Sequence, residues 1–268
     1  MPVSMDALAD DLVAESAVLR ALLADLDEAG WRRETPAEGW TIADQVSHLA
    51  YFDDVAVQSA TDPDAFNAEL ERLDAEGGVN PDSIAARYRG LSGAEMLHWF
   101  DLSRERLVST FRRLDPSTRV PWFGPAMSAA SSLTARIMET WAHGQDVADA
   151  VGVLREPTDR LRHVAHIGVG ARAFSYAVRG RDLPPEPIRV ELDAPGGGLW
   201  TWGPEDAEDR VTGTALDFAL AVTQRRHRDD LALTITGPRA TEWMTIAQAF
   251  AGDAGGGRKP GQFSGGTA

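Results

Sequence analysis

Cysteine is absent from this chain of 268 residues. The chain therefore forms no disulfide, offers no thiolate ligand and has no cysteine nucleophile, so any thiol chemistry must use a thiol from another molecule. Positive charge is also scarce, because 26 Lys and Arg residues stand against 41 Asp and Glu residues, giving a formal net charge of −15. A surface of that sign repels phosphate backbones and anionic lipid headgroups. We therefore expect neither nucleic acid nor a membrane as a partner.

Long apolar runs are missing as well. No segment approaches the roughly 20 consecutive apolar residues that span a bilayer. Residues 1–16 are acidic where a secretory signal would be basic and then apolar, so we expect a cytoplasmic protein. Hydrophobic residues at 43% and charged residues at 25% are close to globular averages and are sufficient for a core. The length predicts one large domain or two modest ones.

Apolar residues recur at helical spacing through the first two thirds of the chain. The second of these runs opens with Thr41 and Asp44, which can form a capping box. Long helices are expected at 5–29, 41–59, 92–114, 128–151 and 158–178, with a short surface helix at 62–76. Long helices joined by short connectors predict a helical bundle.

The pattern changes after residues 184–185, which are both proline. Alternation predicts strands at 188–192 and 199–202 joined by a glycine-rich turn, and a further strand is expected at 231–236. Helices are expected at 215–224 and 240–251. We therefore predict an α plus α+β protein. Its expected parts are a helical bundle at 1–182, a small α+β domain at 183–252 and a mobile glycine-rich tail at 253–268.

The most informative stretch lies in the helix expected at 128–151. Glu139 and His143 are one helical turn apart on one face, within roughly an 80° arc that also holds Arg136 and Asp146. This spacing suits two ligands of one metal ion, as in the Glu and His pairs that line helix bundles. The alternative is the solvated polar face of an amphipathic helix.

A third ligand should come from a facing helix. His48 is the best candidate, because it lies on the flank of the apolar stripe of the helix expected at 41–59. The alternative for His48 is a half-buried histidine without a ligand role. His163 and His166 compete for the position, although an exposed polar face is the simpler interpretation of that pair.

The segment 120–127 is expected to be a loop, because it holds two prolines. It also carries Trp122 and Phe123, and loops with such large aromatic side chains usually pack onto another part of the protein. We therefore expect this loop to cover a site.

These residues also carry a resemblance to a known family. Residues 39–49, which read Gly-Trp-Thr-Ile-Ala-Asp-Gln-Val-Ser-His-Leu, resemble the early signature of the mycothiol-dependent maleylpyruvate isomerase and DinB-like superfamily. Residues 139–149 resemble its second signature. Segments 121–128, 223–227 and 247–252 are similar to an actinobacterial subgroup whose members are mostly uncharacterised.

The resemblance implies a fold and a metal site. The fold would be an N-terminal four-helix bundle of the DinB-like type with a small C-terminal α+β domain. A divalent metal would be bound by His48, Glu139 and His143. Two histidines and one carboxylate leave coordination positions open, as in catalytic sites, and zinc is the expected ion, although nickel, iron or manganese fit the same ligands.

The resemblance also implies mycothiol as the thiol cosubstrate. A metal-coordinated thiol is deprotonated and becomes a nucleophile at neutral pH. Arg225 is expected to bind a substrate carboxylate through two hydrogen bonds, and Arg226 follows it directly in the sequence. Asp146 is expected to orient one of the metal ligands without binding the ion itself. Trp122, Phe123 and Arg226 are the residues expected to bind the cosubstrate.

We therefore predict a metal-dependent, mycothiol-using thiol transferase or isomerase that acts on a small electrophilic molecule. Two alternatives remain open at this point. One is a non-catalytic metal- or ligand-binding protein of the DinB-like type, and the other is a metal-dependent hydrolase in which water replaces the thiol. The sequence leaves the substrate and the oligomeric state open.

Overall fold

The structure is a computed structural model that describes residues 4–75 and 77–263. The chain divides into two compact units, and the division falls between Arg155 and Glu156. This boundary differs from the one near residue 182 expected from the sequence. The helical segment expected at 158–178 lies in the second unit, where its first part packs against another helix of that unit.

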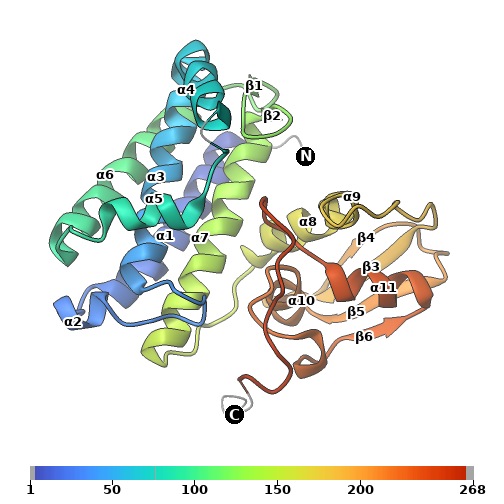
Figure 1. Cartoon of the computed structure of the whole chain (residues 1–268). Helices are drawn as coiled ribbons and strands as arrows, with labels where there is room; N and C mark the ends of the chain where they lie inside the picture. The colour runs from blue at the N-terminus through green and yellow to red at the C-terminus, as the bar shows by residue number, and fades with distance from the viewer. Residues whose placement is uncertain (1–3, 76, 264–268) are drawn as a thin grey trace. The chain divides into compact units, whose positions relative to one another are not determined.

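The first unit is built on four long helices (Figure 1). They are α1 (Met5–Leu23), α3 (Ile42–Thr61), α6 (Gly93–Phe111) and α7 (Ala129–Val151). Helix α3 packs against α6 and α7, and α1 packs against α7 and α6, so the four form a bundle. The shorter elements are α2 (Glu28–Trp31), α4 (Pro63–Ala75), α5 (Pro81–Tyr88) and the two-stranded pair β1 (Arg119–Val120) and β2 (Met127–Ser128).

Local signals set most helix ends. Thr41 and Asp44 form the expected capping box at the start of α3, and α7 ends at Gly152, whose φ of 73° is left-handed. The expected first helix is shorter than 5–29, because α1 ends at Leu23 and Asp27 then caps the separate helix α2. The sequence analysis did not predict α5.

The core of the bundle consists of two apolar clusters with a polar layer between them. One cluster centres on Leu12, Leu107 and Leu133, and the other on Leu49, Phe100 and Val147. Each long helix has residues in both clusters and carries a buried polar side chain between them. These side chains are Ser16, Asp53, Arg104 and Thr140. The site described below lies on α3 and α7 beside this layer.

The second unit combines a mixed sheet with helices. Its strands β3 (Ile188–Asp193), β4 (Leu199–Trp202), β5 (Asp209–Thr214) and β6 (Thr234–Thr236) lie in the order β4-β3-β5-β6. Strands β3 and β5 are parallel, with Val190 opposite Val211, and the two outer pairs are antiparallel. The helical elements are α8 (Leu161–Gly170), α9 (Arg172–Ala177), α10 (Ala215–Val222), the 3₁₀ turn η1 (Arg228–Asp230) and α11 (Pro238–Ile246).

The α plus α+β class is confirmed, while some elements of the second unit differ from expectation. The helix expected at 158–178 is two helices, β5 was not predicted, and β6 is shorter than 231–236. Of the expected tail, residues 264–268 lie outside the described residues. In the described part, backbone amides of Gly255 and Gly261 donate to Gln248 and Asp230.

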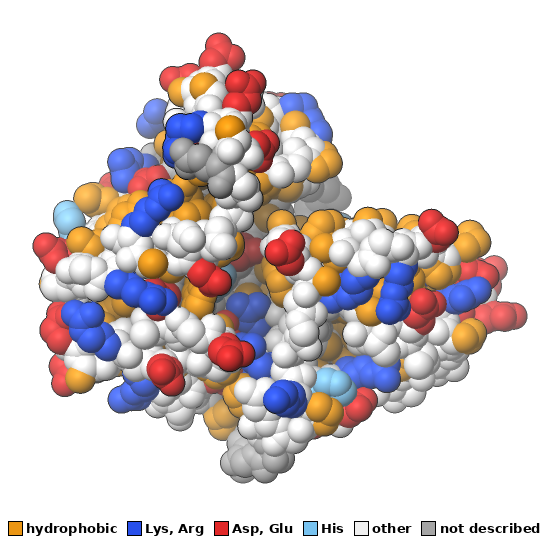
Figure 2. All heavy atoms as spheres, viewed as in Figure 1, with side chains coloured by type: hydrophobic (Ala, Val, Ile, Leu, Met, Phe, Trp, Pro, Cys, Tyr) orange, Lys and Arg blue, Asp and Glu red, His pale blue; other side chains and the backbone are white. Residues whose placement is uncertain are grey.

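Within the described residues, none of the helices has both the length and the apolar composition needed to cross a membrane. Acidic and basic side chains are interspersed on the face that Figure 2 shows, so the acidic excess is not gathered into one patch there.

Candidate metal centre

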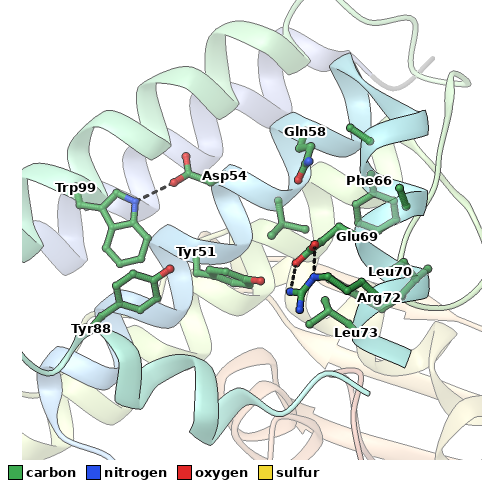
Figure 3. Close-up of a pocket in the computed structure, with 14 residues that line it drawn as sticks. Tyr51, Asp54, Gln58, Phe66, Glu69, Leu70, Arg72, Leu73, Tyr88 and Trp99 are labelled. Atoms are coloured by element: carbon green, nitrogen blue, oxygen red, sulfur yellow. Dashed lines mark hydrogen bonds and ion pairs between the residues drawn. The ribbon is translucent and has the colours of Figure 1, made fainter. Parts of the chain in front are cut away.

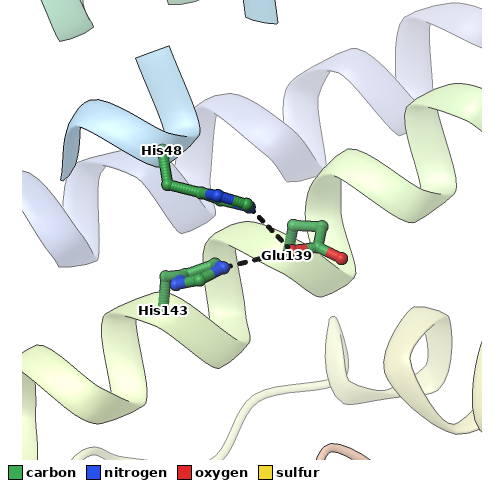
Figure 4. Close-up of side chains that lie close together, drawn as sticks. All are labelled: His48, Glu139 and His143. Atoms are coloured by element: carbon green, nitrogen blue, oxygen red, sulfur yellow. Dashed lines mark hydrogen bonds and ion pairs between the residues drawn. The ribbon is translucent and has the colours of Figure 1, made fainter. Parts of the chain in front are cut away.

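Three side chains converge on one point of the bundle (Figure 4). His48 comes from α3, and Glu139 and His143 come from successive turns of α7. One ligand atom from each residue lies within 4.8 Å of the others, and no second group of this kind occurs among the residues that the structure describes. Glu139 Oε2 is 3.2 Å from His143 Nε2 and 3.7 Å from His48 Nε2.

These separations fit a metal ion. Ligand atoms about 2.0–2.2 Å from a tetrahedral ion lie roughly 3.3–3.6 Å from one another. The separations of 3.2 Å and 3.7 Å lie on either side of that range. Small movements of the three side chains would therefore suffice to coordinate one ion.

The charge states of two of the three residues are those of metal ligands. Burial, together with the charge of His143, lowers the pKa of His48 from 6.5 to about 4, so His48 is neutral near pH 7. Burial alone would raise the pKa of Glu139, but hydrogen bonds and charge interactions with His143 and His48 hold it well below 4.5. An ionised carboxylate and an imidazole lone pair are both available at neutral pH.

A hydrogen-bond chain fixes the orientation of His143. Its Nδ1 faces Gln45 Oε1 at 2.5 Å, the Gln45 amide donates to Thr35 Oγ1 at 2.9 Å, and the Thr35 hydroxyl donates to the carbonyl of Trp40. Because the carbonyl oxygen of Gln45 can only accept, Nδ1 carries a proton, and Nε2, which lies 3.2 Å from Glu139 Oε2, is the nitrogen that would bind a metal ion. Metal-ligating histidines are typically oriented in this way.

Aromatic rings hold His48, whose Nδ1 is buried and has no hydrogen-bond partner in the described part of the chain. Its ring centroid is 5.4 Å from that of Trp40 and 4.6 Å from that of Phe52. The ring of Trp40 also stacks on His143 at 6.0 Å, and its indole N–H donates to Asp82 at 2.6 Å. Ring packing therefore orients His48 in place of a second hydrogen bond.

The aromatic side chains of the loop at 121–126 pack onto α3, the helix that carries His48. The sequence predicts that this loop packs onto another part of the protein. Trp122 and Phe123 lie 6.3 Å and 5.8 Å from the ring of Phe52, and both contact Phe66 of α4. Since Phe52 packs directly on His48, these two side chains reach the candidate metal centre through one intervening ring.

The polar face of α7 is buried, which argues against a solvated helix face. Arg136, His143 and Asp146 are 4%, 9% and 1% exposed. Asp53 accepts hydrogen bonds from the Nε atoms of Arg136 and Arg104, at 3.2 Å and 2.7 Å. These polar residues therefore lie inside the bundle and do not form a solvated face.

The remaining expected site residues stay predictions. Asp146 is buried on α7, but Gln45 is the residue that bonds to His143 Nδ1. Arg225 and Arg226 are half-buried in the second unit, just after α10. Of the other histidines, His163 and His166 lie on α8, while His98 lies on α6 and His227 caps η1.

Sequence analysis missed two residues that shape this site. Gln45 is three residues before His48, and an amide among the apolar residues Ile42, Val46 and Leu49 was the available signal in the sequence. Trp40 directly precedes the capping residue Thr41, where an apolar side chain often packs against the first turns of a helix.

Comparisons with known proteins identify the family of the chain. A family model described as the mycothiol maleylpyruvate isomerase N-terminal domain matches residues 12–148, and one described as wyosine base formation matches residues 184–236. Uncharacterised proteins from two strains of Mycobacterium tuberculosis are 47% identical over 248 residues, which cover 92% of this chain and 96% of theirs.

Two solved structures share the fold. They are the crystal structures of the mycothiol-dependent maleylpyruvate isomerase and of a histidine-to-alanine mutant of it. Each has a TM-score of 0.57, with 18% and 17% identity, and the matches cover 87% of this chain and 93% of theirs. The resemblance and the DinB-like fold expected from the sequence are thus confirmed, and the chain belongs to the mycothiol-dependent maleylpyruvate isomerase family.

Proposed function

We propose that this protein binds one divalent metal ion through His48, Glu139 and His143. It would use mycothiol as the thiol cosubstrate of a transfer or isomerisation on a small electrophilic molecule. The observation that carries this proposal is the convergence of an ionised carboxylate and two imidazoles at separations that suit one ion. Zinc is the ion we expect from two histidines and one carboxylate.

The chemistry divides between the ion and the protein. When bound, a divalent ion with open positions stabilises a thiolate over a thiol and so supplies a nucleophile at neutral pH. The chain holds that ion, and Gln45 keeps His143 in the tautomer that can ligate it. A chain without cysteine has no thiol of its own to compete for this position.

The residues around the ligands would select the reactants. The rings of Trp40 and Phe52 pack on His48 and shield it from water on one side. Trp122 and Phe123 extend the same aromatic surface and are proposed to contact the cosubstrate. Arg226 is proposed to help bind the cosubstrate.

Two further residues complete the proposal. Arg225 is proposed to bind a carboxylate of the substrate, because a guanidinium can pair with it through two hydrogen bonds. Asp146 is proposed to orient one of the metal ligands without binding the ion itself.

A thiol-transfer assay tests this proposal. The zinc-loaded protein should accelerate the conjugation of mycothiol to activated alkenes, and Glu139→Ala should reduce the rate to background because one of the three ligands is lost. The control is Glu105→Ala, an exposed residue of α6. Metal content and thermal unfolding of each variant are measured in parallel.

The outcomes separate the possible functions. Background rates in a parent protein with full metal occupancy would contradict thiol activation. A screen of hydrolysis substrates would then distinguish a hydrolase from a binding protein. Failure of the parent to retain any divalent ion would contradict the metal site itself.

A further inference from the structure

The charged side chains differ between two cavities of this protein. Figure 3 shows a cavity of about 670 Å³ in the first unit. Its charged residues are paired, Glu69 with Arg72 at 2.6 Å and Asp54 with the indole N–H of Trp99 at 2.8 Å. A cavity of about 270 Å³ in the second unit has a mainly basic lining, which includes Arg226, His227, Arg228, Asp229, Arg258 and residues 255–257. Arg226 and a segment near the C-terminus therefore border the same space.

The C-terminal segment, defined here as residues 250–263, is held against other parts of the second unit. The side chain of Gln248 is 1% exposed, and its Oε1 accepts from the backbone N–H of Gly255 at 3.2 Å. Farther along the segment, Asp230 accepts from the backbone N–H of Gly261 at 2.8 Å. Hydrogen bonds at two points therefore fix the course of this glycine-rich segment.

Two aromatic rings of the C-terminal segment contact the arginines that follow α10. The ring centroid of Phe263 lies 3.8 Å from Arg226 Cζ, and that of Phe250 lies 6.0 Å from Arg225 Cζ. Cation–π contacts extend to about 6 Å. A ring stacked on the face of a guanidinium leaves the N–H groups available, because they point along its plane. Phe263 can therefore hold Arg226 without blocking a ligand.

Gln224, which directly precedes the two arginines, has an unusual backbone conformation. Its φ of 59° is left-handed, and the N–H of Arg225 donates to the carbonyl of Leu220 at 2.9 Å, as in a Schellman motif at the end of a helix. Glycine usually occupies this position, because a Cβ is unfavourable there. Glutamine contributes a side chain instead, and its amide donates to the carbonyl of Ala247 at 3.0 Å. This side chain therefore links the end of α10 to the chain just before the C-terminal segment.

The side chain of Gln224 also lies directly against the C-terminal segment at Gly255. A Cβ added at Gly255 would lie 2.3 Å from Gln224 Oε1, so a larger residue would displace Gln224. A Cβ added at Gly256 would meet no atom of the described residues within 4 Å. These neighbouring glycines therefore provide a matched pair of positions for testing the contact between Gln224 and the segment.

We propose that the C-terminal segment positions Arg225 and Arg226 for the reactants, with Phe263 and Gln224 as positioning residues. An unconstrained arginine side chain samples many rotamers, and a ligand that has to order it binds less tightly. Stacking on Phe263 orders Arg226 before a ligand arrives, and Gln224 holds the segment that carries Phe263. The use of the two arginines rests on the proposed function, whereas their positioning can be tested without activity.

Modification of arginine by phenylglyoxal, mapped by peptide mass spectrometry on the full chain, measures how firmly Arg226 is held. Phe263→Leu keeps an apolar side chain but removes the ring. Gly255→Ala displaces the C-terminal segment from Gln224. Each variant should accelerate the modification of Arg226 about two- to fivefold, the change expected from the loss of one exposed cation–π contact.

Two conservative variants and one reference residue control this measurement. Phe263→Tyr keeps an aromatic ring, and Gly256→Ala adds a methyl group that meets no neighbour among the described residues. Both should retain the parent rate of modification at Arg226. Arg20, which is exposed on α1 of the first unit, should react at the same rate in every variant.

The thiol-transfer assay tests whether this positioning serves binding. Phe263→Leu and Gln224→Gly should raise the KM for mycothiol about two- to fivefold and leave kcat unchanged, because binding and not the chemical step is affected. Phe263→Tyr should have the parent KM. Glycine suits the left-handed backbone at position 224, so Gln224→Gly should remain folded, which thermal unfolding checks.

The outcomes separate this inference from the proposed function. Equal modification rates of Arg226 in Phe263→Leu and in the parent would show that the segment does not hold this residue and would overturn the inference. An unchanged KM for mycothiol in the variants of an active parent would overturn it as well. An inactive parent would contradict the proposed function, but the modification rates would still decide whether the segment holds Arg226.

Discussion

Replacing Gln45 by leucine should weaken metal binding without altering a ligand. Leucine approximates the volume of this fully buried side chain, but it cannot accept from His143 Nδ1 or donate to Thr35. A buried N–H left without a partner costs about 1–3 kcal/mol. The metal-free imidazole can turn to relieve this cost, whereas a ligating imidazole cannot, so the penalty falls on the bound state.

The size of the effect follows from that cost. Because about 1.4 kcal/mol corresponds to a factor of ten, we expect an affinity loss of about 5- to 150-fold. Loss of such an orienting partner typically costs about 10- to 100-fold in metal affinity. Zinc affinity is measured by calorimetry in competition with a chelator of known affinity.

Two further variants control this experiment. Gln45→Glu keeps an acceptor for His143 Nδ1 and should retain the parent affinity or exceed it. Ser47→Ala removes a buried hydroxyl of α3 that bonds to the Asp44 carbonyl and not to a ligand, so it should leave zinc affinity unchanged. An affinity of Gln45→Leu within about twofold of the parent, in a folded variant, would refute the orienting role, because that role predicts a larger loss.

Two predictions concern stability. Asp53→Ala leaves two buried guanidinium groups without their shared carboxylate and should lower the free energy of unfolding by about 3–5 kcal/mol. The exposed ion pair of Arg20 and Asp101 predicts a loss of at most about 1 kcal/mol for Asp101→Ala; similar losses for the two variants in urea unfolding would contradict this. Burial raises the pKa of Asp44, but hydrogen bonds from Arg89 and Thr41 outweigh it and hold the value below 3.8. Ionised Asp44 therefore stabilises the fold above the unfolded pKa of about 3.9, and this stabilisation is lost as the pH falls through the lower folded value. Asp44→Asn should flatten the unfolding free energy between about pH 5 and pH 2, and an equally steep profile would refute it.

Local signals in the sequence determined much of the bundle. The apolar period of 3.6 predicted its four long helices, and the capping signal at Thr41 and Asp44 marked where α3 begins. The same helical period places Glu139 and His143 one turn apart on one face of α7. These features depend only on neighbours within one or two turns, so the sequence alone is sufficient to predict them.

The domain boundary and the element limits of the second unit needed the tertiary structure. The segment expected as one helix at 158–178 gives no local indication that it belongs to the second unit, where its first part packs against α10. Strand β5 was missed because only Val211 of its residues is strongly apolar. Its pairing with β3 and β6 stabilises it as a strand.

The third candidate ligand also depended on packing between distant parts of the chain. Periodicity left His48, His163 and His166 as competitors, and only the packing of α3 on α7 brings His48 to Glu139. The same packing buries the polar face of α7, which periodicity alone could not distinguish from a solvated one. Sequence spacing therefore determined which residues share a helix face, whereas tertiary packing decided what that face contacts, because contacts between helices depend on residues far apart in the chain.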